Sequence, residues 1–195
     1  CLHLSDNVGK KCAVSHALDQ ISDSLILATD ADCVPRDKNW IRSMVNHYST
    51  GSCVIGYGPY QKKNGYLNKW IRYETATTAI QYMALAQLAY PYMAVGRNFL
   101  YEHSAFKKAG GFTRHKHILS GDDDLFVRDL HRIGIDVIPN TDPDSFVESI
   151  PPGDANTYWQ QKERHVSTAS SYGPIHQILL MLIPLSLTAL YLSAI

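Results

Sequence analysis

The sequence lacks an excess of charge of either sign, since 18 Lys and Arg balance 18 Asp and Glu in 195 residues. Without a uniform positive field, a DNA- or RNA-binding role is disfavoured. The four cysteines include no C-x-x-C pair, which disfavours a zinc ribbon and a disulfide framework. Only 12 Gly and 9 Pro accompany 45% hydrophobic residues, so collagen-like, repeat-built and disordered classes are excluded and one globular domain is expected.

Charged side chains are also absent from the C-terminal part of the chain, from His165 to Ile195. Its last stretch, residues 178–195, is apolar on every face and comes close to the roughly 20 residues that span a bilayer. We interpret residues 173–195 as the start of a transmembrane segment that follows a globular domain over residues 1–172. A buried terminal helix of a soluble protein is the alternative.

Apolar periodicity predicts an alternation of strands and helices, and hence an α/β fold with a mostly parallel sheet and flanking helices. The expected strands cover residues 25–28, 53–57, 95–101, 135–138 and 145–150. The expected helices cover residues 14–21, 35–48, 67–88, 122–133 and 157–168, with a short one that ends at 110–111. A parallel α/β domain normally has a strand before its first helix, so we expect further sequence upstream of Cys1 that encodes one.

Asp30 and Asp32 directly follow the first predicted strand, where open α/β sheets bind their ligands. If the chain is still extended there, the two side chains share one face and their α-carbons stand about 6.6 Å apart. One carboxylate can then hold Mg²⁺ or Mn²⁺ while the other accepts hydrogen bonds from a hydroxyl group. A polar loop before a helix is the alternative interpretation.

A second acidic site is the run Ser120-Gly121-Asp122-Asp123-Asp124. Acidic residues at a helix start complement the helix dipole, and Ser120 with Asp123 resembles a capping box. Capping does not explain three adjacent carboxylates, which repel one another and raise a pKa, as a general base requires. Both interpretations stay open at this point.

Cationic and amide side chains complete the candidate set. Arg97 and Asn98 lie in a predicted strand, and Gln161 and Arg164 lie just before the uncharged tail. Such donors suit a phosphate-bearing, metal-bound substrate. Because Lys162 and Arg164 precede the apolar stretch, the excess of positive charge places the globular domain on the cytoplasmic side of a membrane.

In this order and spacing, four motifs resemble glycosyltransferase family 2, with its GT-A fold, from about Asn7 to the end of the chain. They are Asp30-Ala31-Asp32, Gly96-Arg97-Asn98 leading to Gly110-Gly111-Phe112, Gly121-Asp122-Asp123-Asp124-Leu125, and Gln161-x-x-Arg164. The segment Asn7-Val8-Gly9-Lys10 resembles the family as well, although Lys10 also fits a solvated helix start.

The resemblance implies a role for each motif. Asp30 would contact the nucleotide part of a sugar donor, and Asp32 would hold the metal. Asp123, or Asp122 beside it, would be the base that deprotonates the acceptor hydroxyl. Gln161 and Arg164 would lie by the donor diphosphate, with Arg97 and Asn98 as further donor-binding residues.

The resemblance further implies an inverting transferase that uses Mn²⁺ or Mg²⁺, a nucleoside-diphosphate sugar, and a sugar or lipid-linked acceptor at a membrane. The family's Gln-x-x-Arg-Trp element has His165 in place of Trp, which disfavours a processive polymerase. Two other classes remain open from the residues alone: a metal-dependent phosphohydrolase or nucleotidyltransferase, and a non-catalytic membrane-anchored module.

Overall fold

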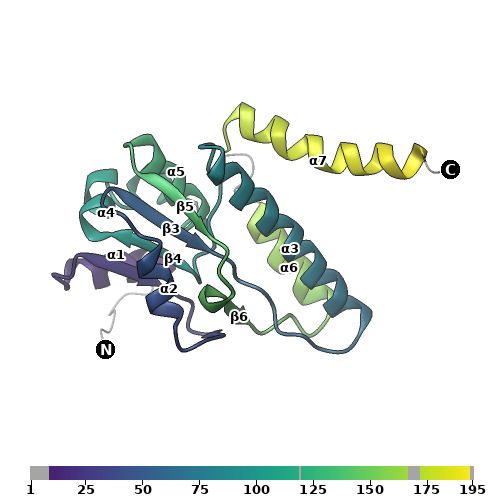
Figure 1. The fold of residues 1–195 in the computed structure, drawn as a ribbon, viewed down its shortest axis with the longest axis horizontal. Helices are drawn as coiled ribbons and strands as arrows, with labels where there is room; N and C mark the ends of the chain where they lie inside the picture. Colours follow the sequence, from purple (N-terminus) through teal and green to yellow (C-terminus); the bar gives the residue numbers. More distant parts are fainter. Residues whose placement is uncertain (1–8, 119, 167–171, 194–195) are drawn as a thin grey trace.

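The computed structural model describes residues 9–118, 120–166 and 172–193 (Figure 1). The strands are β1 (Leu25–Ala28), β2 (Cys33–Pro35), β3 (Ser52–Gly56), β4 (Phe99–Glu102), β5 (Asp136–Asn140) and β6 (Val147–Ser149). The α-helices are α1 (Lys10–Asp19), α2 (Trp40–Asn46), α3 (Tyr66–Gln87), α4 (His103–Ala109), α5 (Asp124–Arg132), α6 (Ala155–Val166) and α7 (Pro174–Ser193). Two 3₁₀ turns, η1 (Thr113–His115) and η2 (Pro143–Ser145), complete the described elements.

The central sheet has four strands in the order β1-β4-β3-β5. Only the β3–β5 pair is parallel, because β4 runs antiparallel to both β1 and β3. The α/β class is therefore confirmed, whereas the expectation of a mostly parallel sheet is corrected to a mixed one. The reason is that β4 has the same short apolar pattern as its neighbours, and such a pattern does not encode strand direction.

Alternating side chains of β3 and β4 divide the core into two layers, as the two-residue period of a strand requires. Cys53 and Ile55 of β3 face the larger cluster, which contains buried residues of α1, α3, α4 and α5. Val54 faces the smaller cluster with Leu100 of β4 and with Trp40 and other residues of α2 and β6. Helices thus cover both faces of the sheet (Figure 1).

A second, two-stranded sheet pairs β2 with β6, so that Cys33 lies opposite Ser149. The segment before it, Asp30-Ala31-Asp32, is a turn in which the Cys33 N–H donates to the Asp30 carbonyl at 3.1 Å. The expected extended conformation at this motif is therefore wrong. The expected helix start at Pro35 is wrong too, because Pro35 ends β2 and α2 begins only at Trp40.

Helix α7 extends away from the sheet at the C-terminal side of the molecule (Figure 1). Over the part of the chain that the structure describes, no helix is long and apolar enough to cross a membrane. The described residues therefore do not support the predicted transmembrane segment over 173–195, and its last two residues lie outside them. Polar His176 and Gln177 in the first turns, and Ser186 and Thr188 further on, interrupt the apolar stretch of α7.

Candidate active site

One cleft of about 570 Å³ brings together most of the residues that the sequence singled out. Asp32, in the turn after β1, and Asp123, just before α5, both line it. The side chains around them come from α1, α3, α6, β6, the loop after β3 and the segment before β4. Polar and aromatic members include Lys10, Asp30, Tyr57, Tyr60, Glu74, Arg97, Asp122, Asp124, Ser149, Tyr158, Gln161 and Lys162. The two acidic patches therefore face one shared space.

The turn after β1 offers a cation-binding group. One ligand atom each from Asp30, Asp32 and Cys33 lies within 4.8 Å of the other two. The turn therefore brings the carboxylates of Asp30 and Asp32 close together, although the backbone is not extended as we expected. Carboxylate oxygens suit Mg²⁺ and Mn²⁺, so Asp30 and Asp32 fit the divalent ion that the resemblance implies.

Lys10, the first residue of α1, joins the two acidic patches. Its Nζ lies 2.7 Å from Asp30 Oδ1 and 2.7 Å from Asp122 Oδ2. Although burial lowers the pKa of Lys10, the carboxylates of Asp122 and Asp30 outweigh it and hold the pKa above the ordinary lysine value. Lys10 is therefore a cation of the cleft, although 48% of its side chain at the start of α1 is exposed.

Asp123 occupies the N-cap position of α5 and is held by the backbone on both sides. Its Oδ1 accepts from the Asp124 N–H and its Oδ2 accepts from the Gly96 N–H, each at 2.8 Å. Burial, followed by the negative charges of Asp122 and Asp124, raises the pKa of Asp123 to about 7. A carboxyl group with this pKa suits a general base at neutral pH.

Two glycines shape the surroundings of Asp123. A Cβ on Gly96 would lie 3.3 Å from Asp123 Oδ2 and 3.1 Å from Lys10 Nζ, so glycine permits the close approach of the backbone. Gly121 has φ of 90°, a conformation that side-chain-bearing residues rarely adopt. Glycine at 121 is therefore needed for the turn into the acidic run, while glycine at 96 leaves room for the side chains of Lys10 and Asp123.

The other two aspartates of the run are engaged differently. Asp122 pairs with Lys10, as described above. Asp124 is buried, and its Oδ1 accepts from the Leu125 N–H at 2.8 Å while its Oδ2 accepts from the Tyr172 hydroxyl at 2.8 Å. Capping and electrostatic roles therefore coexist in the run, and Asp123 is the member with the strongly raised pKa.

Arg97 reaches into the cleft from the segment before β4, since β4 begins only at Phe99. Its Nη2 donates to the Gly58 carbonyl at 2.6 Å, and its guanidinium lies 5.1 Å from the centre of the Tyr60 ring. Its Nε is buried and makes no hydrogen bond within the described structure. A fixed cation with a spare donor fits the binding of an anionic group.

Asn98 does not line the cleft. It is fully buried, accepts from Trp40 Nε1 at 3.0 Å, and donates to the carbonyls of Tyr57 at 2.9 Å and Ser145 at 2.7 Å. Its amide therefore joins three segments of the chain. The motif that we predicted to bind the donor thus places Arg97 and Asn98 in different surroundings.

Helix α6 brings Gln161 to the cleft, where its Nε2 donates to the Tyr60 hydroxyl at 2.9 Å. Arg164 lies three residues further along α6, and its side chain is outside the described part of the structure. Lys162 also lines the cleft and forms an ion pair with Glu74 of α3. The Gln-x-x-Arg element thus begins at the wall of the same cleft.

Sequence reasoning missed several residues of this wall, above all Tyr60, Glu74 and Lys162. Glu74 lies within a long helix and Tyr60 in a loop, and neither position carries a local signal of binding. Lys10 had such a signal in the Gly9-Lys10 step, but its residue type alone equally fits a solvated helix start.

Comparison with known sequences identifies the family. The sequence profile of Glycosyl transferase family 2 matches residues 1–133, which is more than half of the chain. The match includes the turn with Asp30 and Asp32 as well as the acidic run, whereas Gln161 and Arg164 lie beyond it. No curated protein matches the chain. The chain therefore belongs to glycosyl transferase family 2 and is a glycosyltransferase.

Proposed function

We propose that this enzyme transfers a sugar from a nucleoside-diphosphate sugar to a hydroxyl group, with inversion at the anomeric carbon. The observation that supports the proposal most is the single cleft lined by both Asp32 and Asp123. A donor bound across this cleft would have its diphosphate near one acidic patch and its sugar near the other. A volume of about 570 Å³ is in the range of sites for small ligands.

Asp123 is the proposed general base. With a pKa of about 7, it is ionised in a large fraction of molecules at neutral pH and is still basic enough to take a hydroxyl proton. The activated oxygen then attacks the anomeric carbon from the side opposite the diphosphate, which inverts the configuration. Asp122 is the less suitable base because its carboxylate is paired with Lys10.

Asp32 and Asp30 are the proposed ligands of Mg²⁺ or Mn²⁺, an ion that would offset negative charge on the donor diphosphate. Asp30 would also accept hydrogen bonds from the nucleotide part of the donor. Arg97 and Gln161, which line the cleft, and Arg164, one turn after Gln161 on α6, are the proposed donor-binding residues. Their cationic and amide groups can balance the charge that develops on the leaving diphosphate.

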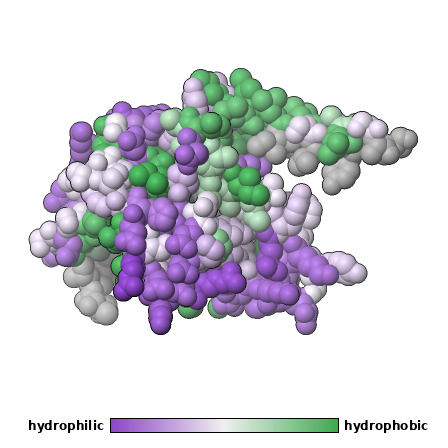
Figure 2. All heavy atoms as spheres, in the orientation of Figure 1, coloured by the Kyte–Doolittle hydropathy of each residue, from purple (hydrophilic) through white to green (hydrophobic). Residues whose placement is uncertain are grey.

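We propose a lipid-linked or cell-envelope glycan as the acceptor. Helix α7 exposes many apolar side chains, namely Ile175, Ile178, Met181, Leu182, Leu185, Leu190 and Leu192. Figure 2 shows hydrophobic residues gathered along this helix. Contact of α7 with a lipid surface would bring such an acceptor to the enzyme. Cosedimentation with anionic lipid vesicles tests this, and loss of binding in Met181→Glu would support it, whereas no binding by the unchanged protein would contradict it.

The reaction itself is tested with a panel of uridine- and guanosine-diphosphate sugars, with and without Mn²⁺. The proposal predicts release of the nucleoside diphosphate from at least one donor. Release of inorganic phosphate or pyrophosphate in its place would contradict the proposal. Calorimetry with uridine and guanosine diphosphates, in which Mn²⁺ should strengthen binding, measures the donor site without an acceptor.

A further inference from the structure

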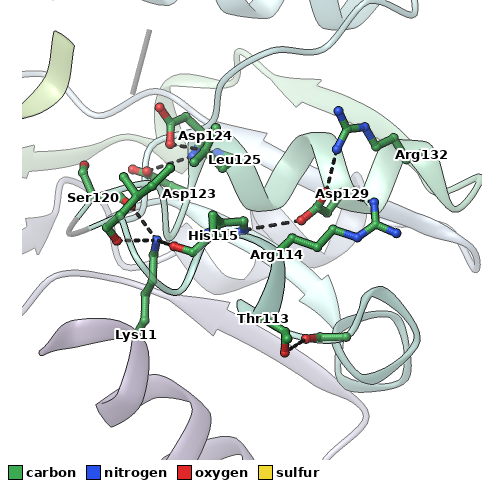
Figure 3. Close-up of polar contacts among 12 residues, drawn as sticks. Lys11, Thr113, Arg114, His115, Ser120, Asp123, Asp124, Leu125, Asp129 and Arg132 are labelled. Atoms are coloured by element: carbon green, nitrogen blue, oxygen red, sulfur yellow. Dashed lines mark hydrogen bonds and ion pairs between the residues drawn. The ribbon is translucent and has the colours of Figure 1, made fainter. Parts of the chain in front are cut away.

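Lys11, the residue after Lys10, is buried in the first turn of α1 with 8% of its surface exposed. Its Nζ donates to three carbonyl oxygens: those of His115 at 2.8 Å, Ile118 at 2.9 Å and Ser120 at 2.5 Å. An ammonium group has three N–H donors and no acceptor, so all three donors are used. Figure 3 shows the side chain of Lys11 reaching from α1 to this segment.

The three bonds end where the acidic run begins. Ser120 precedes Gly121, whose positive φ turns the chain into Asp122 and Asp123. Lys10 holds the same run by a different contact, the side chain of Asp122. Consecutive residues of a helix point about 100° apart, so two neighbouring lysines can reach the backbone and a carboxylate of one segment.

The other end of the segment is held by α5 (Figure 3). His115 Nε2 lies 3.4 Å from Asp129 Oδ2, and Asp129 is buried with 3% of its side chain exposed. Arg132 and Arg114 pair with the other oxygen of Asp129, at 3.1 Å and 3.6 Å. Lys11 therefore completes a set of contacts that fix the chain on both sides of the turn into the acidic run.

The charge of Lys11 acts on the run as well. Burial lowers the pKa of Lys11, while the carboxylates of Asp122, Asp124 and Asp123 raise it. By the same interaction, the positive charge of Lys11 favours the ionised form of Asp123. A neutral residue at position 11 would lose both the three hydrogen bonds and this electrostatic support.

We infer that Lys11 is a positioning residue for glycosyl transfer: its ammonium group fixes the backbone that leads into the acidic run and so holds Asp123 in the cleft. The inference rests on the proposed function, in which Asp123 is the base. Lys11 itself does not line the cleft, so it would act on the rate of the reaction and not on the binding of the donor.

The test compares Lys11→Met, which keeps the length of the side chain but removes its charge and donors, with Lys11→Arg. Lys116→Met is the control, since Lys116 is exposed on the same segment. With a sugar nucleotide that the enzyme cleaves, Lys11→Met should lower kcat at least tenfold and leave the donor KM within twofold. The acid limb of its pH profile should move to higher pH, because a positive charge near Asp123 is lost.

Lys11→Arg should keep the acid limb in place and have a higher kcat than Lys11→Met. It restores the positive charge but not the geometry of the three hydrogen bonds. An unchanged kcat in Lys11→Met would overturn the inference, and so would a loss of kcat with an unmoved acid limb. If Lys11→Met does not fold, Lys11→Arg decides: its kcat should fall about threefold or more at constant KM, and an unchanged kcat would refute the inference.

A second measurement does not depend on turnover. In amide hydrogen exchange, peptides that cover residues 120–127 should exchange at least tenfold faster in the Lys11 variants than in Lys116→Met, while β3 should be unchanged. Equal exchange would overturn the inference. Failure of the proposed function looks different: the unchanged enzyme would then release no nucleoside diphosphate from any donor, and exchange would still report whether Lys11 holds the run.

Discussion

Asp30 and Asp122 lie on either side of one ammonium group, since Lys10 Nζ is 2.7 Å from a carboxylate oxygen of each. The turn after β1 and the acidic run before α5 are distant in sequence, and this lysine joins them across the cleft. Without the lysine, the two carboxylates would face each other unscreened.

Substitution of Lys10 by Met should therefore lower turnover at least tenfold, because repulsion between Asp30 and Asp122 displaces both acidic patches. The rate of nucleoside-diphosphate release measures the effect. Lys38→Met, at an exposed position away from the cleft, should keep full activity. Full activity in Lys10→Met would show that the bridge is dispensable.

The pH dependence of kcat/KM should have an acid limb near pH 7. The pKa of Asp123 is raised to about 7, chiefly by burial, so the active ionised form accumulates as pH rises through that value. Below it, the rate should fall about tenfold per pH unit. A rate that stays constant from pH 5.5 to 8.5 would argue against Asp123 as the base.

The same carboxyl group should make folding stability depend on pH. Because its pKa in the folded protein lies above that in the unfolded chain, the native state binds the proton more tightly, and stability falls as pH rises from about 4 to 7. Between pH 5 and 8 this costs about 2 to 3 kcal/mol.

Asp123→Asn removes this dependence. We compare the melting temperature of Asp123→Asn with that of the unchanged protein at each pH. The difference, variant minus unchanged protein, should be roughly 5 to 10 °C larger at pH 8 than at pH 5. Differential scanning calorimetry at the two pH values measures it. A temperature difference that does not change with pH would mean that the pKa of Asp123 is not raised.

Asn98→Ala should destabilise the fold by about 3 kcal/mol, because it removes the buried hydrogen bonds to Trp40 Nε1 and to the Ser145 carbonyl, and a third bond to the Tyr57 carbonyl. Urea unfolding measures this loss. Arg97→Ala is the matched comparison, since its side chain lines the cleft and its loss should weaken nucleoside-diphosphate binding more than stability. If Asn98→Ala instead kept its stability and lost nucleoside-diphosphate binding, Asn98 would be a donor-binding residue after all.

The sequence allowed the α/β class and most element positions to be predicted, because apolar periodicity is local. The direction of β4 could not be predicted, since its buried residues have the same pattern in either direction. The pairing of Cys33 with Ser149 depends on long-range contacts and left no local signal.

For the site, the two acidic motifs were recognisable because unusual runs of carboxylates stand out in a sequence. Their convergence on one cleft was a hypothesis that the structure supports. The separation of Arg97 from Asn98 could not be predicted, since adjacent residues in an irregular segment have no fixed relative orientation. The burial of Lys11 could not be predicted either, because lysine is almost always exposed.

The most direct test of the account combines turnover and binding in Asp123→Asn and Asp32→Asn, with Asp19→Asn as an exposed control. Asp123→Asn should bind the nucleoside diphosphate with Mn²⁺ as the unchanged enzyme does, yet lose turnover by about 10²- to 10⁴-fold. Asp32→Asn should lose the Mn²⁺-dependent part of binding. Unchanged turnover in Asp123→Asn, or unchanged Mn²⁺-dependent binding in Asp32→Asn, would contradict a shared site for donor and base.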